Sequence, residues 1–500
     1  MGSKLKVLLL YPNLQMVNLL PSNLAVLSAC LKRNGFEVKL FDTTLYRTEE
    51  KSIDDIRVEY MQIRPFNLNE KGVFYKKSDL YDDFRKLVRK YDPQVIGVTS
   101  TDDTYDLGIS LIGSIDKKSI HVIFGGVHAT FSPQTIIENP LVDSVCVGEG
   151  EEAFVELCER LKNGVDISTI HNLWVKNPEG GVVKNPLGEL ADINKLPYED
   201  FSIFESQRFF RPMQGKVFRM IPVSIDRGCP FSCSFCAAPM LRKFYHEHNI
   251  KSNYFRVKSL DKVVDEIKHQ VTQYRADYIY FNSETFLAGK EDIWEKFAEE
   301  YADKIGLPFW CQTRIETITK DRLKLLKRMG CDRLSIGLEH GNEQFRNKIL
   351  KKTFSNKQVI EAFQILEACR IPVTVNNIIG FPDETREMVF DTIRLNRAIV
   401  ADSINAYYFV PYRGSPLREF CIKKGYIDPA AKTDSLMRSS ILKMPQLSAA
   451  EIKGLVRTFP LYVKMEETFF DKIRIAESSS PEGQEMFENL RNIYFKTYFK

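Results

Sequence analysis

Three cysteines stand within eight positions of one another in the segment DRGCPFSCSFCAAP. Cys229, Cys233 and Cys236 have the spacing C-x3-C-x2-C. A structural zinc site closes its coordination with four ligands, usually from paired C-x2-C motifs, and no second pair is present in this sequence. Iron-sulfur clusters also bind thiolates, and ferredoxin-type clusters use four. Three thiolates would leave one iron open to a small chelating molecule, in the way that a catalytic metal keeps an open position.

The composition describes a folded protein of two or three domains. The chain has 500 residues, of which 44% are apolar and 27% are charged. The formal net charge is +4 and no long basic block occurs, so no nucleic-acid partner is expected. No apolar run reaches the roughly 20 residues of a membrane span. Ten cysteines are too few for a disulfide scaffold in so long a chain, and we expect a cytoplasmic protein.

Residues 1–160 alternate short apolar runs with helical patterns. This order predicts an N-terminal doubly wound, Rossmann-like parallel sheet, with an irregular insertion at about residues 46–78. Such sheets bind ligands beyond the carboxyl ends of their strands. Small residues at three of these ends suggest a large planar or phosphate-bearing ligand. The candidate contacts are Thr99, Ser100, Thr101, Gly125, Gly126, His128, Gly148, Glu149 and Gly150.

A second α/β series follows a connector at residues 161–218. Residues 219–420 hold six repeats of strand then helix, which predict a partial (β/α)6 TIM-like barrel. Chemistry in such a barrel lies on the loops at the carboxyl ends of the strands, and the three cysteines follow the first strand. Residues 421–500 are helical and rich in Phe and Tyr, which indicates core packing or, less often, a hydrophobic cap over a substrate.

The segment RGCPFSCSFC resembles the signature of the radical S-adenosylmethionine (SAM) enzymes. In that family three cysteines hold a 4Fe-4S cluster, and SAM chelates the fourth iron. The reduced cluster cleaves SAM to a 5'-deoxyadenosyl radical, so such enzymes are oxygen-sensitive. The motifs YFNSETF, CQTRIE and SIGLEHG resemble later parts of the family's barrel, although Asn282 and Ser283 depart from its usual residues. By this resemblance the residues that contact SAM are Phe235, Glu284, Arg314 and Glu339.

The N-terminal 160 residues resemble the cobalamin-binding domain of one subgroup of this family, so the resemblance covers about residues 4–420. It implies that the ligand of the first sheet is cobalamin. The Asp-x-His-x-x-Gly motif, which supplies a cobalt ligand in other cobalamin proteins, is absent because Gly126 stands where Asp would precede His128. We therefore expect His128 to pack within its loop and the lower face of cobalt to lack a protein histidine.

The resemblance implies a cobalamin-dependent radical SAM methylase that acts on an unactivated carbon through a 5'-deoxyadenosyl radical and methylcobalamin. Its substrate would be a small molecule or lipid, and its reductant a flavodoxin or ferredoxin. Some relatives catalyse cyclisation or ring rearrangement instead, as in anaerobic tetrapyrrole cyclisation, and no residue separates these outcomes. Two further alternatives are a methylthiotransferase, disfavoured by the uneven spacing of Cys30, Cys146 and Cys158, and a non-enzymatic electron-transfer or scaffold protein.

Overall fold

The computed structural model describes residues 4–177, 179–289 and 291–499. The chain forms two compact units, and each is made from three separate stretches. Unit 1 comprises Met1–Ser52, Leu68–Arg211 and Leu241–Lys258, and unit 2 comprises Ile53–Asn67, Pro212–Met240 and Ser259–Lys500. The domain boundaries expected from the sequence, at residues 160, 218 and 420, stay a prediction.

Unit 1 contains a seven-stranded sheet in the order β2-β1-β3-β4-β5-β6-β7. The first five strands pair in parallel, and β6 and β7 add an antiparallel hairpin. This hairpin comes from the predicted connector and extends the sheet by two strands. The strands are β1 (Lys6–Tyr11), β2 (Glu37–Asp42), β3 (Val95–Thr99), β4 (His121–Gly125), β5 (Ser144–Cys146), β6 (Leu173–Lys176) and β7 (Val182–Lys184).

Helices cover both faces of this sheet, as a doubly wound fold requires. On one face, α3 (Leu80–Tyr91) and α4 (Tyr105–Gly113) pack on Leu8, Ile96 and Phe124 in a single hydrophobic cluster. On the other face, α1 (Ser22–Arg33) contacts α7 (Glu151–Asn163). A Cβ atom at Gly97 would lie 2.6 Å from the ring of Phe154 on α7, so α7 packs directly on the backbone of β3. The predicted Rossmann-like fold is confirmed.

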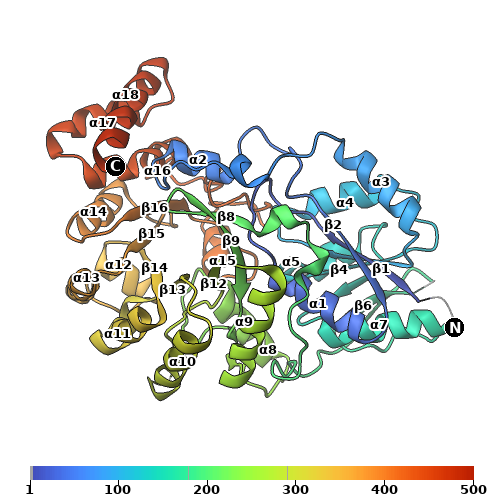
Figure 1. The fold of residues 1–500 in the computed structure, drawn as a ribbon. Helices are drawn as coiled ribbons and strands as arrows, with labels where there is room; N and C mark the ends of the chain where they lie inside the picture. The colour runs from blue at the N-terminus through green and yellow to red at the C-terminus, as the bar shows by residue number, and fades with distance from the viewer. Residues whose placement is uncertain (1–3, 178, 290, 500) are drawn as a thin grey trace. The chain divides into compact units, whose positions relative to one another are not determined.

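Unit 2 contains a second seven-stranded sheet, in the order β16-β15-β14-β13-β12-β9-β8. Its six strands from β9 to β16 pair in parallel in chain order, and helices lie outside the curled sheet (Figure 1). The predicted six-repeat partial barrel is therefore confirmed, with β8 (Phe210–Met213) as an added edge strand. The parallel strands are β9 (Lys216–Val223), β12 (Tyr278–Phe281), β13 (Phe309–Thr313), β14 (Cys331–Glu339), β15 (Val373–Ile379) and β16 (Ser403–Tyr408). The connecting helices include α9 (Leu260–Tyr274), α10 (Glu291–Lys304), α11 (Lys320–Met329), α13 (Asn356–Cys369) and α14 (Arg386–Arg397).

The open edge of the partial barrel is covered by a segment from the N-terminal half of the chain. Residues Ile53–Asn67, which include α2 (Ile53–Glu59), belong to unit 2. The Gln62 side chain donates a 2.9 Å hydrogen bond to the carbonyl of Ala406 on the edge strand β16. An uncovered edge strand would present unpaired backbone groups, so part of the expected irregular insertion serves to complete the barrel.

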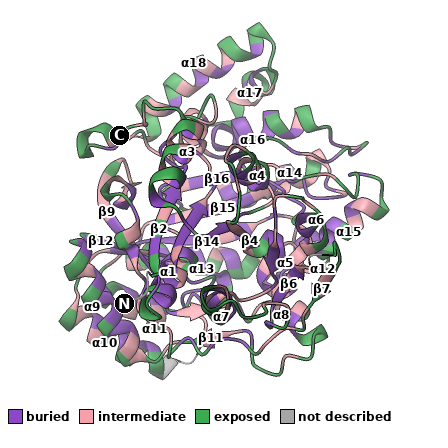
Figure 2. Ribbon diagram, turned by 90° about the vertical axis from the view of Figure 1, so that its right-hand side faces the viewer, coloured by how far each residue is buried: buried purple, intermediate pink, exposed green. Residues whose placement is uncertain are grey.

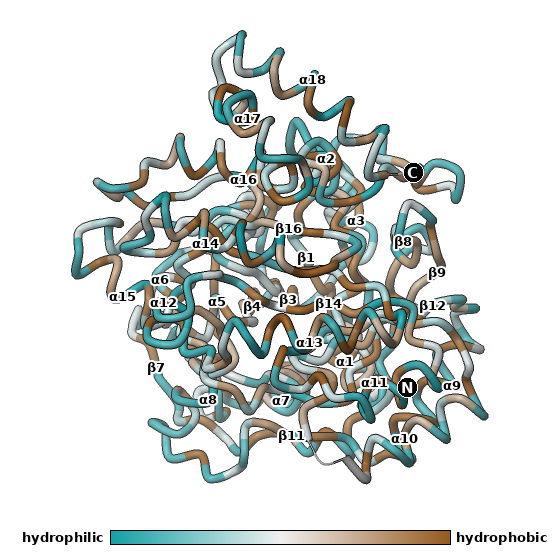
Figure 3. Tube along the Cα trace, turned by 90° about the vertical axis from the view of Figure 1, so that its left-hand side faces the viewer, coloured by the Kyte–Doolittle hydropathy of each residue, from teal (hydrophilic) through white to brown (hydrophobic). Residues whose placement is uncertain are grey.

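The C-terminal region is helical, as expected, and consists mainly of α16 (Ala449–Lys464), α17 (Phe470–Ala476) and α18 (Pro481–Tyr498). Hydrophobic and hydrophilic positions alternate along α18 (Figure 3). Its buried side chains Phe487, Leu490 and Tyr494 follow helical spacing, so these aromatic residues pack in the core. None of the helices in the described ranges combines the length and the apolar character needed to cross a membrane.

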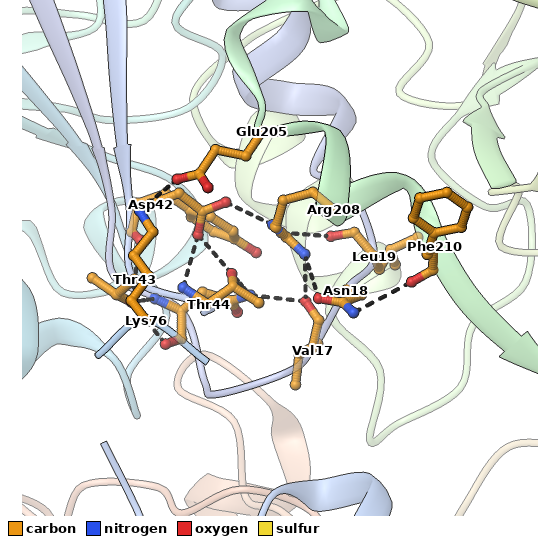
Figure 4. Close-up of polar contacts among 12 residues, drawn as sticks. Val17, Asn18, Leu19, Asp42, Thr43, Thr44, Lys76, Glu205, Arg208 and Phe210 are labelled. Atoms are coloured by element: carbon orange, nitrogen blue, oxygen red, sulfur yellow. Dashed lines mark hydrogen bonds and ion pairs between the residues drawn. The ribbon is translucent and has the colours of Figure 1, made fainter. Parts of the chain in front are cut away.

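A buried arginine organises the polar end of unit 1, beside the last residue of β2 (Figure 4). Arg208 is 1% exposed, and its Nε lies 2.7 Å from Oδ2 of Asp42. The same guanidinium donates hydrogen bonds to the carbonyls of Val17 and Leu19 and to Oδ1 of Asn18, at 3.1 to 3.3 Å. This one side chain therefore holds the loop that follows β1 against the end of β2. The neighbouring strands β1 and β3 are largely buried, whereas β2, at the edge of the sheet, is only partly buried (Figure 2).

Arg208→Met should lower the free energy of unfolding by about 3–5 kcal/mol, because it leaves the Asp42 carboxylate buried without its partner. Chemical denaturation of the full chain measures this change. Arg85→Met is the matched control, since Arg85 pairs with Asp82 on the surface of α3, where such pairs contribute about 0–1 kcal/mol. Equal effects of the two substitutions would contradict the assigned role of Arg208.

Candidate active site

The three cysteines lie on the loop that joins β9 to α8 (Ala237–Glu247). Cys229 and Cys233 are buried and Cys236 is partly exposed, directly before the helix begins. The chain enters this loop through Gly228, whose φ of 92° is a conformation that side-chain-bearing residues rarely adopt. The local sequence therefore turns the chain sharply out of the barrel strand and directs three thiols to one place.

Two of the thiols have partners from neighbouring barrel strands. Nη1 of Arg314 lies 2.8 Å from Sγ of Cys233, and Oγ1 of Thr285 lies 3.7 Å from Sγ of Cys229. Arg314 directly follows β13, and Thr285 follows β12 by a few residues. Hydrogen bonds to sulfur are among the means by which proteins adjust the potential of an iron-sulfur cluster.

The residues between the cysteines fix the loop to other carboxyl-end segments of the barrel. Ser234 donates from its backbone N–H to the carbonyl of Leu350 at 3.1 Å and from its hydroxyl to the carbonyl of Ile349 at 2.6 Å. The ring of Phe235 packs edge-on against Phe381, with 5.8 Å between the ring centroids. The contacts of Ser234 and Phe235 therefore limit the motion of the cysteine loop, and none of them involves a sulfur atom.

Burial disfavours the charged form of two of these thiols, Cys229 and Cys236. It raises the pKa of Cys229, and it raises the pKa of Cys236 to about 12, with a further contribution from the negative charge of Glu284. The carboxyl of Glu284 remains accessible to solvent, but the protein around it partly desolvates it and raises its pKa. Burial therefore favours the protonated form of Cys229 and Cys236, whereas bound iron would deprotonate both thiols.

The donor set fits a cluster better than a single ion. The three thiols interact electrostatically, so they lie near one another. Within residues 4–177, 179–289 and 291–499, however, no three His, Cys, Asp or Glu side chains are close enough to hold one metal ion. A 4Fe-4S cluster binds its thiolates at different iron atoms, so it suits three sulfurs that are close but not convergent.

Arg314 has several partners within the protein, in addition to its predicted contact with SAM. Its Nε lies 3.2 Å from Oε2 of Glu316, and its guanidinium lies 4.0 Å from the ring centroid of Phe231. Burial opposes the charge, but Glu316 and Cys233 outweigh it and raise the pKa of Arg314. Arg314 therefore supplies a fixed positive charge beside Cys233, and its contact with the SAM carboxylate stays a prediction.

Glu339 ends β14 in an unusual backbone conformation. Its φ is 66°, and the pairing of β14 with β15 shifts register between Gly337 and Glu339. Non-glycine residues with positive φ carry backbone strain, which often occurs at functional sites. A Cβ atom at Gly337 would lie 2.2 Å from Oε1 of Glu339, so only glycine leaves room for this carboxylate.

Two polar contacts at this end of the barrel were not expected from the sequence. Nζ of Lys352 lies 3.0 Å from Oε1 of Glu339, and it donates to the carbonyl of Gly337 at 2.6 Å. Nε2 of His340 lies 3.0 Å from Oε1 of Glu384, and both side chains are fully buried. The His340–Glu384 contact joins the motif SIGLEHG to the segment that follows β15. Lys352 follows another lysine in a polar stretch that carries no signal of its role.

In unit 1 the three predicted cobalamin-binding loops lie together at one edge of the sheet, which is formed by the carboxyl ends of its parallel strands. The N–H of Ser100 donates to the carbonyl of Gly125 at 3.4 Å, and the N–H of Gly148 donates to Oγ1 of Thr130 at 3.1 Å. A Cβ atom at Gly126 would lie 3.0 Å from Oγ1 of Thr99. The residues at this edge are Thr99, Ser100, Thr101, Gly125, Gly126, Gly148, Glu149 and Gly150.

Glycine backbone and small hydroxyl groups form this edge, and both allow a large ligand to approach the chain closely. Gly126 and Gly148 have φ values of 98° and 89°, so neither position accepts a side chain without strain. The residues present therefore fit the expected cobalamin. Glu149 differs from the others, because its carboxylate pairs with Arg256 and accepts the N–H of Ala191 at 2.9 Å, so its side chain holds the loop in place.

His128 is buried beside this edge. Its Nδ1 lies 3.3 Å from Oδ1 of Asp102, and its ring centroid lies 5.1 Å from that of Tyr105. These contacts match the expected packing of His128 within its loop.

The protein combines a doubly wound domain with a glycine-lined edge and a partial barrel with a three-cysteine loop, an arrangement that defines cobalamin-binding radical SAM proteins. The B12 binding domain model matches residues 18–158, and the Radical SAM superfamily model matches residues 223–395. The chain belongs to the radical SAM family whose members carry a B12-binding domain. The predicted family, its enzymatic nature and its cofactor set of 4Fe-4S cluster, SAM and cobalamin are confirmed at the level of these domains.

Similar proteins include methyltransferases and a cyclase. The chain is 27% identical to an uncharacterized methyltransferase of Pyrococcus horikoshii, over 75% of this chain and 80% of that protein. It is also 27% identical to the anaerobic magnesium-protoporphyrin IX monomethyl ester cyclase of Rubrivivax gelatinosus, over 73% and 67% of the two chains. The fold resembles the radical SAM methyltransferase TsrM from Kitasatospora setae, solved with cobalamin and a 4Fe-4S cluster, with a TM-score of 0.63 and 18% identity over 93% of this chain and 82% of that one.

Single substitution of Cys229, Cys233 or Cys236 by alanine should abolish most of the iron and acid-labile sulfide bound after anaerobic reconstitution. Each change removes a direct ligand, and even the loss of an outer-shell partner typically lowers metal affinity by about 10–100-fold. Iron and sulfide analysis of the purified variants measures this. Cys369→Ala, in the partly exposed last turn of α13, should retain wild-type cluster content. Retention of a full cluster by any of the three variants would refute the assigned ligand set.

Proposed function

We propose that the protein is a cobalamin-dependent radical SAM methyltransferase that methylates an unactivated carbon of a small-molecule or lipid substrate. The observation that carries this proposal is the pairing of two sites in one chain. One is a loop of three thiols, which leaves one iron of a cluster open to SAM. The other is a sheet edge that fits cobalamin and lacks the histidine motif for a cobalt ligand.

Cys229, Cys233 and Cys236 would hold the cluster. When bound, the cluster and SAM supply an electron and a 5'-deoxyadenosyl radical, and cobalamin supplies the methyl group. The remaining roles belong to the protein's own side chains, which bind and orient SAM at the carboxyl ends of the barrel strands. Phe235, Glu284, Arg314 and Glu339 are the proposed SAM contacts, and the fixed charge of Arg314 beside Cys233 supports its place in this set.

Cobalamin would bind along the glycine-lined edge of unit 1. We infer that His128 does not bind cobalt, since its imidazole is buried against Asp102 and Tyr105. Bound cobalamin would therefore be held by the glycine-lined edge without a histidine from this loop, and it would supply methyl-transfer chemistry there, which agrees with a methylase.

A second candidate is a cobalamin-binding radical SAM cyclase. Its support is specific, because the cyclase of Rubrivivax gelatinosus is as similar in sequence, at 27% identity, as the methyltransferase of Pyrococcus horikoshii. A cyclase would cleave SAM to 5'-deoxyadenosine without forming S-adenosylhomocysteine. A non-enzymatic electron-transfer protein would form neither product, so product analysis separates the three candidates.

The remaining partners follow from the same chemistry. A cluster that reduces SAM needs a strong one-electron donor, and we propose a flavodoxin or ferredoxin. None of the ten cysteines, all within the described residues, forms a disulfide, which agrees with a reducing compartment, and we propose a cytoplasmic location.

The proposed methylase should form both 5'-deoxyadenosine and S-adenosylhomocysteine. The test is anaerobic reconstitution with iron, sulfide and hydroxocobalamin, followed by dithionite reduction with SAM and chromatography of the products. Omission of cobalamin should remove S-adenosylhomocysteine and leave 5'-deoxyadenosine. If the loaded protein forms 5'-deoxyadenosine alone, the cyclase replaces the methylase, and if it forms neither product, the enzymatic proposal fails.

A further inference from the structure

A buried lysine lies beside the predicted SAM contact Glu339, at the end of β14. Lys352 is 2% exposed, although a lysine is rarely buried without a partner. Its Nζ lies 3.0 Å from Oε1 of Glu339 and donates to the carbonyl of Gly337 at 2.6 Å. No proposed contact with SAM or with the cluster involves Lys352, so its burial at this place needs another reason.

The backbone that carries Glu339 is irregular, and Lys352 bonds to it where the irregularity begins. The pairing of β14 with β15 shifts register between Gly337 and Glu339, and Glu339 has a φ of 66°. A register shift interrupts the ladder of backbone hydrogen bonds, so the backbone groups at that point need other partners. Lys352 supplies a donor to the carbonyl of Gly337. The lysine therefore binds both the irregular backbone and the carboxylate that extends from it.

Arg346, which is fully buried, holds the chain on both sides of this ion pair. Its Nη1 donates to the carbonyl of His340 and its Nη2 to the carbonyl of Phe354, each at 2.7 Å. His340 directly follows Glu339. Phe354 comes two residues after Lys352. The two charged side chains therefore extend from segments that one buried guanidinium fixes to each other.

The segment that carries Lys352 is also bound to the cysteine loop. Ser234 donates its hydroxyl to the carbonyl of Ile349 at 2.6 Å and its backbone N–H to the carbonyl of Leu350 at 3.1 Å. Two residues further along the chain, Lys352 bonds to Glu339. Through this short segment, the loop that would hold the cluster is joined to the carboxylate that is predicted to contact SAM.

The ion pair occupies one carboxylate oxygen of Glu339 and leaves the other open. Oε1 accepts a hydrogen bond from Lys352. Within residues 4–177, 179–289 and 291–499, no group forms a hydrogen bond with Oε2. The side chain is 12% exposed, so a ligand has access to it. The contact with Lys352 therefore determines which oxygen of Glu339 is available to a ligand.

We propose that Lys352 is a positioning residue for SAM, which holds the Glu339 carboxylate in the orientation that leaves Oε2 free to accept a hydrogen bond from SAM. The inference rests on the proposed function, because it assumes that Glu339 contacts SAM. It goes further by assigning a role to a residue outside the predicted set of SAM contacts. The effect of Lys352 on SAM passes through Glu339.

The physical reason is that a charged group on a strained backbone needs a partner to keep one orientation. Residues with unusual backbone angles persist only where the surrounding structure holds them. The ammonium of Lys352 also compensates the charge of Glu339, which is unfavourable to keep away from water without a partner. Methionine would fill the space of Lys352 without supplying either hydrogen bond, so Glu339 would lose the contact that orients it.

Equilibrium dialysis of radiolabelled SAM tests the proposal on the reconstituted full chain with an oxidised cluster, which binds SAM without cleaving it. Lys352→Met should raise the dissociation constant of SAM by about tenfold or more, as the loss of an outer-shell partner typically does. Lys352→Arg keeps the positive charge and should raise the constant less. Lys351→Met is the matched control, because Lys351 is the neighbouring lysine and is exposed, and it should leave the constant unchanged.

A double-mutant cycle with Glu339→Gln separates a positioning role from a general structural one. If Lys352 acts through Glu339, the protein with both Lys352→Met and Glu339→Gln should bind SAM no more weakly than the protein with Glu339→Gln alone. Effects that multiply would overturn the proposal, and so would unchanged SAM binding by Lys352→Met. Iron content and cobalamin absorbance show whether each variant holds its cofactors. Their loss from both Lys352→Met and Lys352→Arg would assign Lys352 to the fold and would also overturn the proposal.

Failure of this inference is distinct from failure of the proposed function. If the wild-type protein binds SAM and Lys352→Met binds it equally well, only the role of Lys352 is refuted. If the wild-type protein holds a full cluster and does not bind SAM, the proposed function fails, and the role of Lys352 fails with it.

Discussion

The organisation of unit 2 depends on placing three thiols close together, two of them buried, without a closed set of four ligands. Burial raises the pKa of Cys229 and Cys236, so the loop alone favours neutral thiols. A bound cluster reverses this preference because its iron atoms stabilise thiolates. Arg314 adds a fixed positive charge beside Cys233. The hydrogen bonds of Ser234 to the segment before Lys352 keep the loop in place, so the sulfur atoms remain available to iron.

The parallel barrel brings the other functional groups to the same end. Arg314 and Glu339 follow adjacent strands, and the carboxyl ends of parallel strands meet at one edge. Glu339 reaches its position only through a register shift and a positive φ, with Gly337 leaving space for the carboxylate and Lys352 pairing with it. The backbone at this point therefore departs from regular strand geometry, as is common where a site needs a side chain in a particular direction.

The sequence predicted the regular elements well because their signals are local. The runs KVLLLYP, QVIGVTS, DYIYFN and LPFWCQT correspond to β1, β3, β12 and β13, since short apolar segments bounded by turn residues form buried strands. The cysteine loop was also apparent, because its residues are adjacent in the chain. The structure then brings the predicted SAM and cobalamin residues to two strand-end sites, one in each unit, but their contacts with the cofactors stay predictions.

Features that depend on long-range contacts could not be predicted in this way. Nothing in residues 53–67 indicates that Gln62 closes the edge strand β16, because its partner Ala406 lies more than three hundred residues away. Lys352 is hidden for another reason, because its partner Glu339 is only 13 residues away but its polar stretch carries no signal of its role.

The most direct test of the central claim is electron paramagnetic resonance of the reduced, reconstituted protein with and without SAM, using iron enriched in 57Fe. If three thiolates hold a 4Fe-4S cluster with one open iron, SAM should shift the g values of the reduced cluster, and SAM labelled with 17O or 15N at its carboxylate or amino group should show hyperfine coupling to it. Identical spectra with and without SAM, or a cluster that survives the loss of any one of Cys229, Cys233 and Cys236, would contradict the account.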